Sequence, residues 1–151
     1  MEQALDEAHR AESEGEIPVG AVVVQNGEVI ARAHNRPVSG CDPTAHAEML
    51  AVRAAAECLG NYRLNGCDVY TTLEPCAMCA GALVHARIRR LVYAAADPKA
   101  GAVHSHLRLL EAAHLNHRVE VVAGVLAEEA AALLQRFFVL RRQEKNGDDG
   151  S

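Results

Sequence analysis

Two short motifs, H-A-E and P-C-A-M-C, carry the side chains of this sequence that could perform hydrolytic chemistry. They supply three ligands that zinc prefers, the imidazole of His46 and the thiolates of Cys76 and Cys79. A catalytic zinc typically keeps three protein ligands and a water, whose pKa falls to about 7 on the metal. Glu48 is then free to move protons. The motifs therefore predict a hydrolytic site with one zinc per chain.

The spacing of the two cysteines predicts that one helix presents both of them. Cys76 and Cys79 stand three residues apart, nearly one helical turn, so their sulfurs can point the same way. Pro75 suits the first turn of that helix, where a missing N–H is not needed. The free N–H groups of a helix start also favour the thiolate form.

A second helix start is expected at the other motif. Asp42 fits the N-cap and Pro43 the first turn of a helix that continues through residues 45–59. This places His46 and Glu48 in the opening turn. We expect the site to form where the two helix starts face each other.

A structural zinc site or buried cysteines would be the less specific interpretation of the same motifs. A structural site needs a fourth ligand, for which the candidates are Cys41, Cys67, His85 and His104. Glu48 has no role in such a site. Its position in the motif therefore favours catalysis.

Length and composition fit one intracellular domain. The chain has 151 residues, for which we expect a single domain over residues 1–145 and a disordered tail over residues 146–151. Its apolar stretches are well short of the roughly 20 residues of a membrane span, and no signal segment begins the chain. Five cysteines, partly committed to metal, do not suggest a disulfide framework. We therefore expect a cytoplasmic protein that does not contact membranes.

The net charge of −5 argues against nucleic acid as a partner, but the charge is unevenly distributed. Acidic residues gather in the first sixteen positions and in the tail. Basic residues gather at two places, Arg87, Arg89 and Arg90, and Arg136, Arg141, Arg142 and Lys145. A local basic face is possible on such a chain, although solvated helix surface explains the same clusters.

The hydrophobic pattern predicts an alternating α/β fold. Helices are expected at residues 1–14, 45–59, 76–86, 103–113 and 127–143, and strands at 19–25, 28–34, 68–73, 90–94 and 118–122. Asn26-Gly27 predicts a hairpin between the first two strands. Residues 68–94 predict a β-α-β unit. The result is a five-stranded sheet with helices on both faces.

Together with H-x-E and P-C-x-x-C, the signature of zinc nucleobase deaminases, several longer segments resemble the bacterial tRNA-specific adenosine deaminases. The resemblance covers about residues 16–142 and includes I-P-V-G-A, N-R-P, D-P-T, N-Y-R-L, T-L-E, D-P-K-A-G and N-H-R-V. It implies a three-layer α/β/α, cytidine-deaminase-like fold with a five-stranded mixed sheet. It also implies a homodimer that converts the wobble adenosine of an arginine tRNA anticodon stem-loop to inosine.

The resemblance assigns roles within the site. It gives zinc to the three ligands named above and the proton shuttle to Glu48. Asn35 matches a residue that holds the base by hydrogen bonds, although a turn asparagine fits the same position. Asp97 matches a position beside the ribose of a flanking nucleotide, where a 2′-OH would favour RNA over DNA.

Further substrate contacts are implied less specifically. Lys99, Arg141 and Arg142 fit phosphate contacts and Phe138 fits the pocket wall, but each fits surface or core packing equally well. The segment V-H-S-H at residues 103–106 and the short N-terminus depart from the family pattern. A deaminase of free cytosine, guanine or cytidine remains an alternative, as does a non-catalytic zinc-stabilised subunit.

Overall fold

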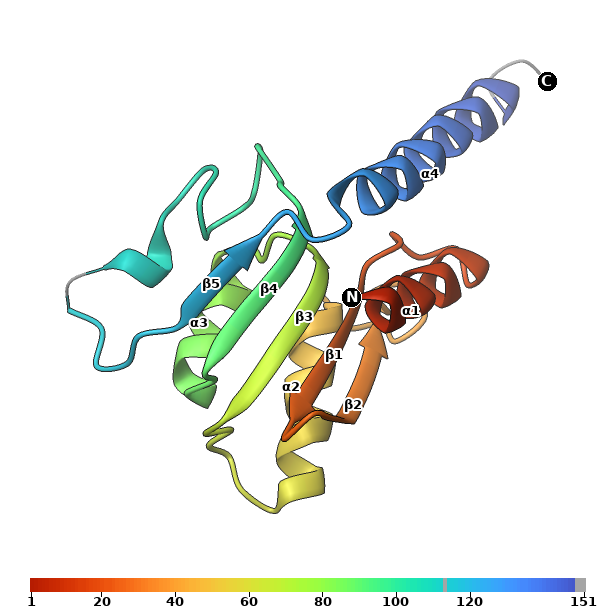
Figure 1. Cartoon of the computed structure of the whole chain (residues 1–151). Coiled ribbons are helices and arrows are strands. Elements are labelled where there is room, and N and C mark those ends of the chain that lie inside the picture. Colours follow the sequence, from red (N-terminus) through yellow and green to blue (C-terminus); the bar gives the residue numbers. More distant parts are fainter. Residues whose placement is uncertain (113, 149–151) are drawn as a thin grey trace.

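A five-stranded mixed sheet forms the centre of the computed structural model, which describes residues 1–112 and 114–148 (Figure 1). The strand order is β2-β1-β3-β4-β5. β1 pairs antiparallel with β2 and β3, whereas β3, β4 and β5 run parallel. The bounds are β1 Gly20–Gln25, β2 Glu28–His34, β3 Cys67–Leu73, β4 Arg90–Ala95 and β5 Glu120–Ala123.

Helices lie on both faces of this sheet, as the sequence predicts. α2 (Ala47–Leu59) and α3 (Ala77–Ala86) lie on one face, and α1 (Glu2–Ser13) lies on the other (Figure 1). α4 (Ala127–Asp148) packs on β4 at its beginning and then projects beyond the sheet. The predicted three-layer α/β/α arrangement is confirmed.

Local sequence explains the hairpin. Asn26 and Gly27 both have positive φ, 51° and 78°, which is the conformation that a two-residue turn with the twist of the sheet requires. The strands on either side begin and end within a residue of the predicted bounds. The hairpin prediction is confirmed.

The β3-α3-β4 unit determines where a site can form. β3 and β4 are parallel neighbours, so both end at one edge of the sheet. α2 and α3 begin at this same edge, and α4 leaves the body there (Figure 1). In open α/β sheets, ligands bind beyond the carboxyl ends of the strands.

The main core lies between the sheet and the pair α2 and α3. Its largest members are fully buried, and they include Leu64, Leu83, Ile88 and Leu91. Small buried side chains on α2, such as Ala47 and Ala51, let that helix lie close to the strands. A rigid core therefore supports both helix starts.

The predicted helix over residues 103–113 is wrong. The segment forms turns followed by one short 3-10 helix, η1 (Leu109–Glu111), and residue 113 lies outside the described residues. The N–H groups of Val103, His104 and Ser105 donate to the carboxylate of Glu74, which precedes them by about thirty positions. A distant side chain thus fixes the backbone of this loop in place of local helical propensity.

The end of the chain also differs from the prediction. Residues 146–148, expected as part of a disordered tail, are the last residues of α4, and residues 149–151 lie outside the described residues. Residues 141–145 are good helix formers, and each added residue gains one hydrogen bond. Among the described residues, no helix is long and apolar enough to span a bilayer.

Candidate metal centre

Three side chains from the two helix starts meet at one point. The Nδ1 atom of His46 lies 3.7 Å from the sulfur of Cys76 and 3.5 Å from that of Cys79. Tetrahedral zinc with bond lengths of about 2.0 Å to nitrogen and 2.3 Å to sulfur separates its ligands by about 3.5–3.8 Å. The donor types and their separations therefore fit zinc.

Each helix start places its ligands by its capping residue. His46 is the N-cap of α2 and Cys76 is the N-cap of α3, with Cys79 in the first turn. Both caps have extended backbone, and neither side chain makes a capping hydrogen bond to its own helix. The prediction that two helix starts face each other is confirmed.

The predicted capping role of Asp42 is wrong. α2 begins at Ala47, whose N–H donates to Oδ1 of Asn35 at 2.8 Å. Asp42 instead accepts from the N–H and the hydroxyl of Thr44, both at 2.8 Å, in a local turn. Because Asn35 comes from the end of β2, tertiary structure and not the preceding segment determines where α2 starts. Pro43 accordingly lies outside the helix.

The predicted place of Pro75 in the first helical turn is also wrong. Cys76 is the N-cap, so Pro75 precedes the helix. Its carbonyl accepts a hydrogen bond from Ala102 at 2.8 Å. Pro75 therefore joins the metal-ligand segment to the loop after β4.

Hydrogen bonding among the three side chains places negative charge on one sulfur. Cys76 accepts from the thiol of Cys79 and from His46, which lowers the pKa of Cys76 to about 3 although burial opposes this. The same contact with Cys76, together with burial, raises the pKa of Cys79. The hydrogen bond to Cys76 raises the pKa of His46. A thiolate is thus favoured even before a cation binds.

Glu48 lies beside this cluster in the first turn of α2. Its side chain is buried, with 5% of the residue exposed. Burial raises the pKa of Glu48, while hydrogen bonding to its own backbone and to Cys79 opposes the rise. A carboxyl group with a raised pKa can hold and release a proton nearer to neutral pH.

None of the four possible fourth ligands joins the cluster within the described residues. Cys41 is exposed, and Cys67 is buried in the main core at the start of β3. His85 lies at the end of α3. His104 bonds through Nδ1 to the hydroxyl of Tyr93 at 2.7 Å. A three-ligand arrangement is what a catalytic zinc needs.

The expected base-contacting residue, Asn35, is buried at the end of β2. Its backbone N–H donates to Val19, and its Oδ1 accepts from Ala47. The N–H donor of Ala47 requires an oxygen opposite it, which fixes the orientation of the amide. Nδ2 has no hydrogen-bond partner among the described residues and is available to a ligand.

The loop after β4 carries Asp97 and Lys99. Asp97 is half-buried, and its Oδ1 accepts from the N–H groups of Lys99 and Ala100 at 3.2 Å each. Lys99 is exposed. Sequence reasoning missed Glu74, which binds both ends of this loop. The signal was an acidic residue between a buried strand and the metal motif.

On α4, Phe138 and Arg142 are exposed. Arg141 is engaged differently from its expected phosphate role, because its guanidinium stacks on Phe137 at 5.0 Å and donates to the carbonyl of Gly15. It therefore ties α4 to the end of α1.

Much of the predicted basic surface is paired with acidic side chains. Arg89 and Arg90 donate to the buried Asp68, with distances of 2.6 to 2.9 Å. Arg136 donates to Glu12 at 2.9 Å. The two basic clusters consequently offer less free charge than their composition indicates.

Comparison with known proteins agrees with this geometry. The family model of the cytidine and deoxycytidylate deaminase zinc-binding region matches residues 1–95. A tRNA-specific adenosine deaminase of Bacillus subtilis is 48% identical over 145 residues, which cover 96% of this chain and 90% of that protein. Another, from Haemophilus influenzae, is 49% identical over 146 residues, with coverage of 96% and 84%.

Solved structures show the same likeness. One from work on A-to-I editing by tRNA:A34 deaminases at the wobble position has a TM-score of 0.87 and 50% identity, covering 89% of this chain and 97% of that one. A guanine deaminase from Nitrosomonas europaea has a TM-score of 0.76 and 28% identity, covering 89% and 80%. Because the stronger likeness extends over nearly the whole chain and not the metal motifs alone, this chain belongs to the tRNA-specific adenosine deaminase family, within the zinc-binding cytidine and deoxycytidylate deaminases.

Proposed function

We propose that this chain converts adenosine to inosine by zinc-dependent hydrolysis at the wobble position of a tRNA anticodon loop. The observation that carries the proposal is the buried carboxylate of Glu48 beside three metal-ligand side chains. The names of the relatives with 48% and 49% identity support the choice of substrate.

The metal would be held by Nδ1 of His46 and the sulfurs of Cys76 and Cys79. When bound, zinc supplies a water that ionises near neutral pH. Glu48 would take up a proton from the attacking water and deliver it to N1 of adenine as the water oxygen bonds to C6. Glu48 then carries the remaining hydroxyl proton to the exocyclic nitrogen. That nitrogen leaves as ammonia, and the oxygen stays as the C6 carbonyl of inosine.

Asn35 would orient the base. Its Oδ1 accepts from the N–H of Ala47, and its Nδ2 group would be the donor to a substrate. A purine ring nitrogen such as N7 can accept from it. Since the same amide caps the helix that carries Glu48, the base and the proton carrier would share one support.

The nucleotides next to the target adenosine would be held by the loop after β4 and by α4. Asp97 is proposed to accept from a ribose 2′-OH, while Lys99 and Arg142 contact phosphates and Phe138 lines the pocket. Arg141 would act through its packing between Phe137 and Gly15. An arginine tRNA is the proposed substrate, which implies a cytoplasmic enzyme.

One assay tests the proposal against its alternatives. The pure protein is incubated with an RNA anticodon stem-loop, free adenosine, cytidine and guanine, and inosine, uridine, xanthine and ammonia are measured. We expect inosine from the stem-loop far in excess of any product from the free compounds. Better turnover of a free compound than of the stem-loop would favour a deaminase of free nucleobases or nucleosides. The likeness to a guanine deaminase is the observation that supports this alternative. Inactivity of the zinc-loaded protein on all of them would favour a non-catalytic subunit.

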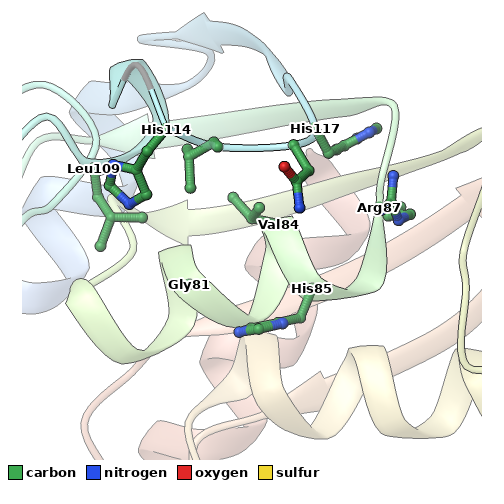
Figure 2. Close-up of a pocket in the computed structure, with 9 residues that line it drawn as sticks. Gly81, Val84, His85, Arg87, Leu109, His114 and His117 are labelled. Atoms are coloured by element: carbon green, nitrogen blue, oxygen red, sulfur yellow. The ribbon is translucent and has the colours of Figure 1, made fainter.

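We also propose that two copies of the chain form a C2 dimer through the outer face of α3. A hollow of about 280 Å³ lies between α3 and the segment around His114 and His117 (Figure 2). Gly81, Val84 and His85 line it from the helix, together with Leu109. Gly81, Val84 and Leu109 are small or apolar and suit packing against a second copy. If light scattering at micromolar concentration shows only monomer and the protein is fully active at that concentration, the proposed dimer is contradicted.

A further inference from the structure

Glu74 lies between the end of β3 and the metal-ligand segment, and its carboxylate accepts five hydrogen bonds. It is 2% exposed. Oε1 accepts from the N–H of Asp97 at 3.1 Å and from the hydroxyl of Ser105 at 2.5 Å. Oε2 accepts from the N–H groups of Val103, His104 and Ser105 at 2.9 to 3.1 Å.

All five donors belong to the loop of residues 97–105, and they come from its two ends. Asp97 is the first residue of the loop, and residues 103–105 are the last. The carboxylate of Glu74 therefore joins the two ends of the loop by hydrogen bonds. At 101, a Cβ would overlap the carboxyl group of Glu74 and lie 2.6 Å from the carbonyl of Asp97, so only glycine fits there.

The same carboxylate connects the loop to the metal ligands. Glu74 is followed by Pro75 and Cys76 along the chain, and the N–H of Ala102 donates to the carbonyl of Pro75 at 2.8 Å. A shift of the loop relative to the ligand segment would break hydrogen bonds at both places. Glu74 and the hydrogen bond of Pro75 thus hold Asp97 in place relative to Cys76.

We propose that Glu74 is a positioning residue that sets the preference for ribose over deoxyribose beside the target adenosine, by holding Asp97 in place. The inference rests on the proposed function, since it takes Asp97 as the group that meets the 2′-OH. Glu74 does not touch the substrate. It acts through the loop that does.

An amide in place of the Glu74 carboxylate would lose at least one of its hydrogen bonds. A carboxylate only accepts hydrogen bonds, and here every neighbour is a donor. In Glu74→Gln, the new NH2 group would face at least one N–H group of the loop. Hydrogen bonds to a charged acceptor are also among the stronger ones. The variant should keep its fold and zinc but lose the fixed position of Asp97.

The test compares the stem-loop with two chimeras that carry a single 2′-deoxyribose, on either side of the target adenosine. For the wild type, we expect kcat/KM to fall about tenfold on one chimera, the size of a lost hydrogen bond to a charged group. For Glu74→Gln, the ratio of kcat/KM on the all-ribose stem-loop to kcat/KM on that chimera should fall toward one. KM for the stem-loop should rise severalfold, with kcat and zinc content nearly unchanged.

Asp68→Asn is the matched control. Asp68 is a buried carboxylate at the other end of β3, where it accepts charge-assisted hydrogen bonds from Arg89 and Arg90. Its loss should lower stability without changing the ribose ratio. Ser105→Ala is the second variant, because it removes the hydroxyl that donates to Glu74 and leaves the carboxylate in place. We expect a smaller change of the ratio in the same direction.

Four outcomes would overturn the inference. The first is an unchanged ratio of kcat/KM between ribose and deoxyribose substrates in both Ser105→Ala and folded Glu74→Gln, and the second is an equal change of this ratio in Asp68→Asn. The third is a wild type whose kcat/KM is the same on both 2′-deoxy chimeras as on the stem-loop. The fourth is a Glu74→Gln variant in which only kcat falls. In each of these the wild type still deaminates the RNA stem-loop, so the proposed function stands. If it does not deaminate any stem-loop, the proposed function fails and the inference fails with it.

Discussion

The Oδ1 atom of Asn35 accepts a hydrogen bond of 2.8 Å from the backbone N–H of Ala47, the residue between His46 and Glu48. One buried amide thereby joins the end of β2 to the first turn of the helix that carries His46 and Glu48. The contact does not involve Nδ2, which is proposed to bind the base. It therefore gives the same residue a structural role and a proposed binding role, which substitutions can separate.

Substitution of Asn35 by Asp or by Ala should separate these two roles. Asn35→Asp keeps an oxygen for the N–H of Ala47 but offers no amide donor to the base. We expect thermal stability close to the wild type and a large loss of kcat/KM. Asn35→Ala loses the cap as well and should be less stable by about 1 kcal/mol. Calorimetry and single-turnover assays measure the two effects, and full activity of Asn35→Asp would remove Asn35 from the binding site.

Substitution of Cys79 by Ala should remove zinc and destabilise the fold. Metal binding is linked to folding, because the ligands adopt their arrangement only in the folded chain. We expect about one zinc per chain in the wild type by metal analysis, and very little in the variant. Cys58→Ala, which changes an exposed cysteine outside the metal cluster, is the control and should retain zinc. Retention of zinc by Cys79→Ala would contradict the assigned ligand set.

Substitution of Glu48 by Ala should abolish turnover but preserve the metal. General acid–base catalysis contributes roughly 10²- to 10⁴-fold, and the loss is larger if the same group positions the water. Zinc content and stem-loop affinity should stay within a few-fold of the wild type. If zinc is lost together with activity, Glu48 is a ligand and the assigned division of roles is wrong.

Substitution of Asp97 by Asn should relax the discrimination against DNA. The carboxylate is proposed to accept from a 2′-OH, whereas an amide can also meet a deoxyribose without an unpaired charge. We expect the ratio of kcat/KM between RNA and DNA stem-loops to fall severalfold, as measured with matched sequences. Lys99→Ala should weaken both nucleic acids alike and reduce the salt dependence of binding. An unchanged ratio in Asp97→Asn would exclude the ribose contact.

Acid should remove the stability that Asp68 contributes. Hydrogen bonding from Arg89 lowers the pKa of Asp68 below its ordinary value of 3.8, with Arg90 adding to the effect and burial opposing it. A carboxyl group whose pKa is lower in the folded state stabilises the fold above the unfolded value. This contribution is lost as the pH falls from about 4 through the folded pKa.

The comparison of Asp68→Asn with the wild type measures this contribution. At pH 7 the free energy of unfolding of the variant should be about 1 kcal/mol lower than that of the wild type. The effect is modest because solvent screens the exposed guanidinium of Arg89. Urea titrations between pH 7 and pH 2.5 should show the difference shrinking below about pH 4. A difference that stays constant down to pH 2.5 would assign the effect to packing and not to charge.

Local features of the sequence were sufficient to predict the cluster of His46, Cys76 and Cys79, the hairpin at Asn26-Gly27 and the β3-α3-β4 unit, whereas the catalytic role of Glu48 stays a prediction. Each depends on residues that are close in the chain, so spacing and residue type constrain the geometry directly. Cys76 and Cys79 share one helical turn wherever that helix lies. The extent of the domain over residues 1–145 stays a prediction.

Tertiary structure alone decided where α2 begins and how the loop after β4 is shaped. Asp42 is a good local capping residue, but the cap comes from Asn35. Residues 103–113 have helical propensity, but Glu74 binds the N–H groups of Val103 and His104, and the N–H of Leu109 donates to the carbonyl of Ala102 and not to the carbonyl four residues before it. In both places a buried side chain from a distant segment accepts hydrogen bonds from backbone N–H groups and so holds the local backbone. Leaving a buried polar group unpaired costs more free energy than local helical propensity contributes, and this decides the backbone conformation.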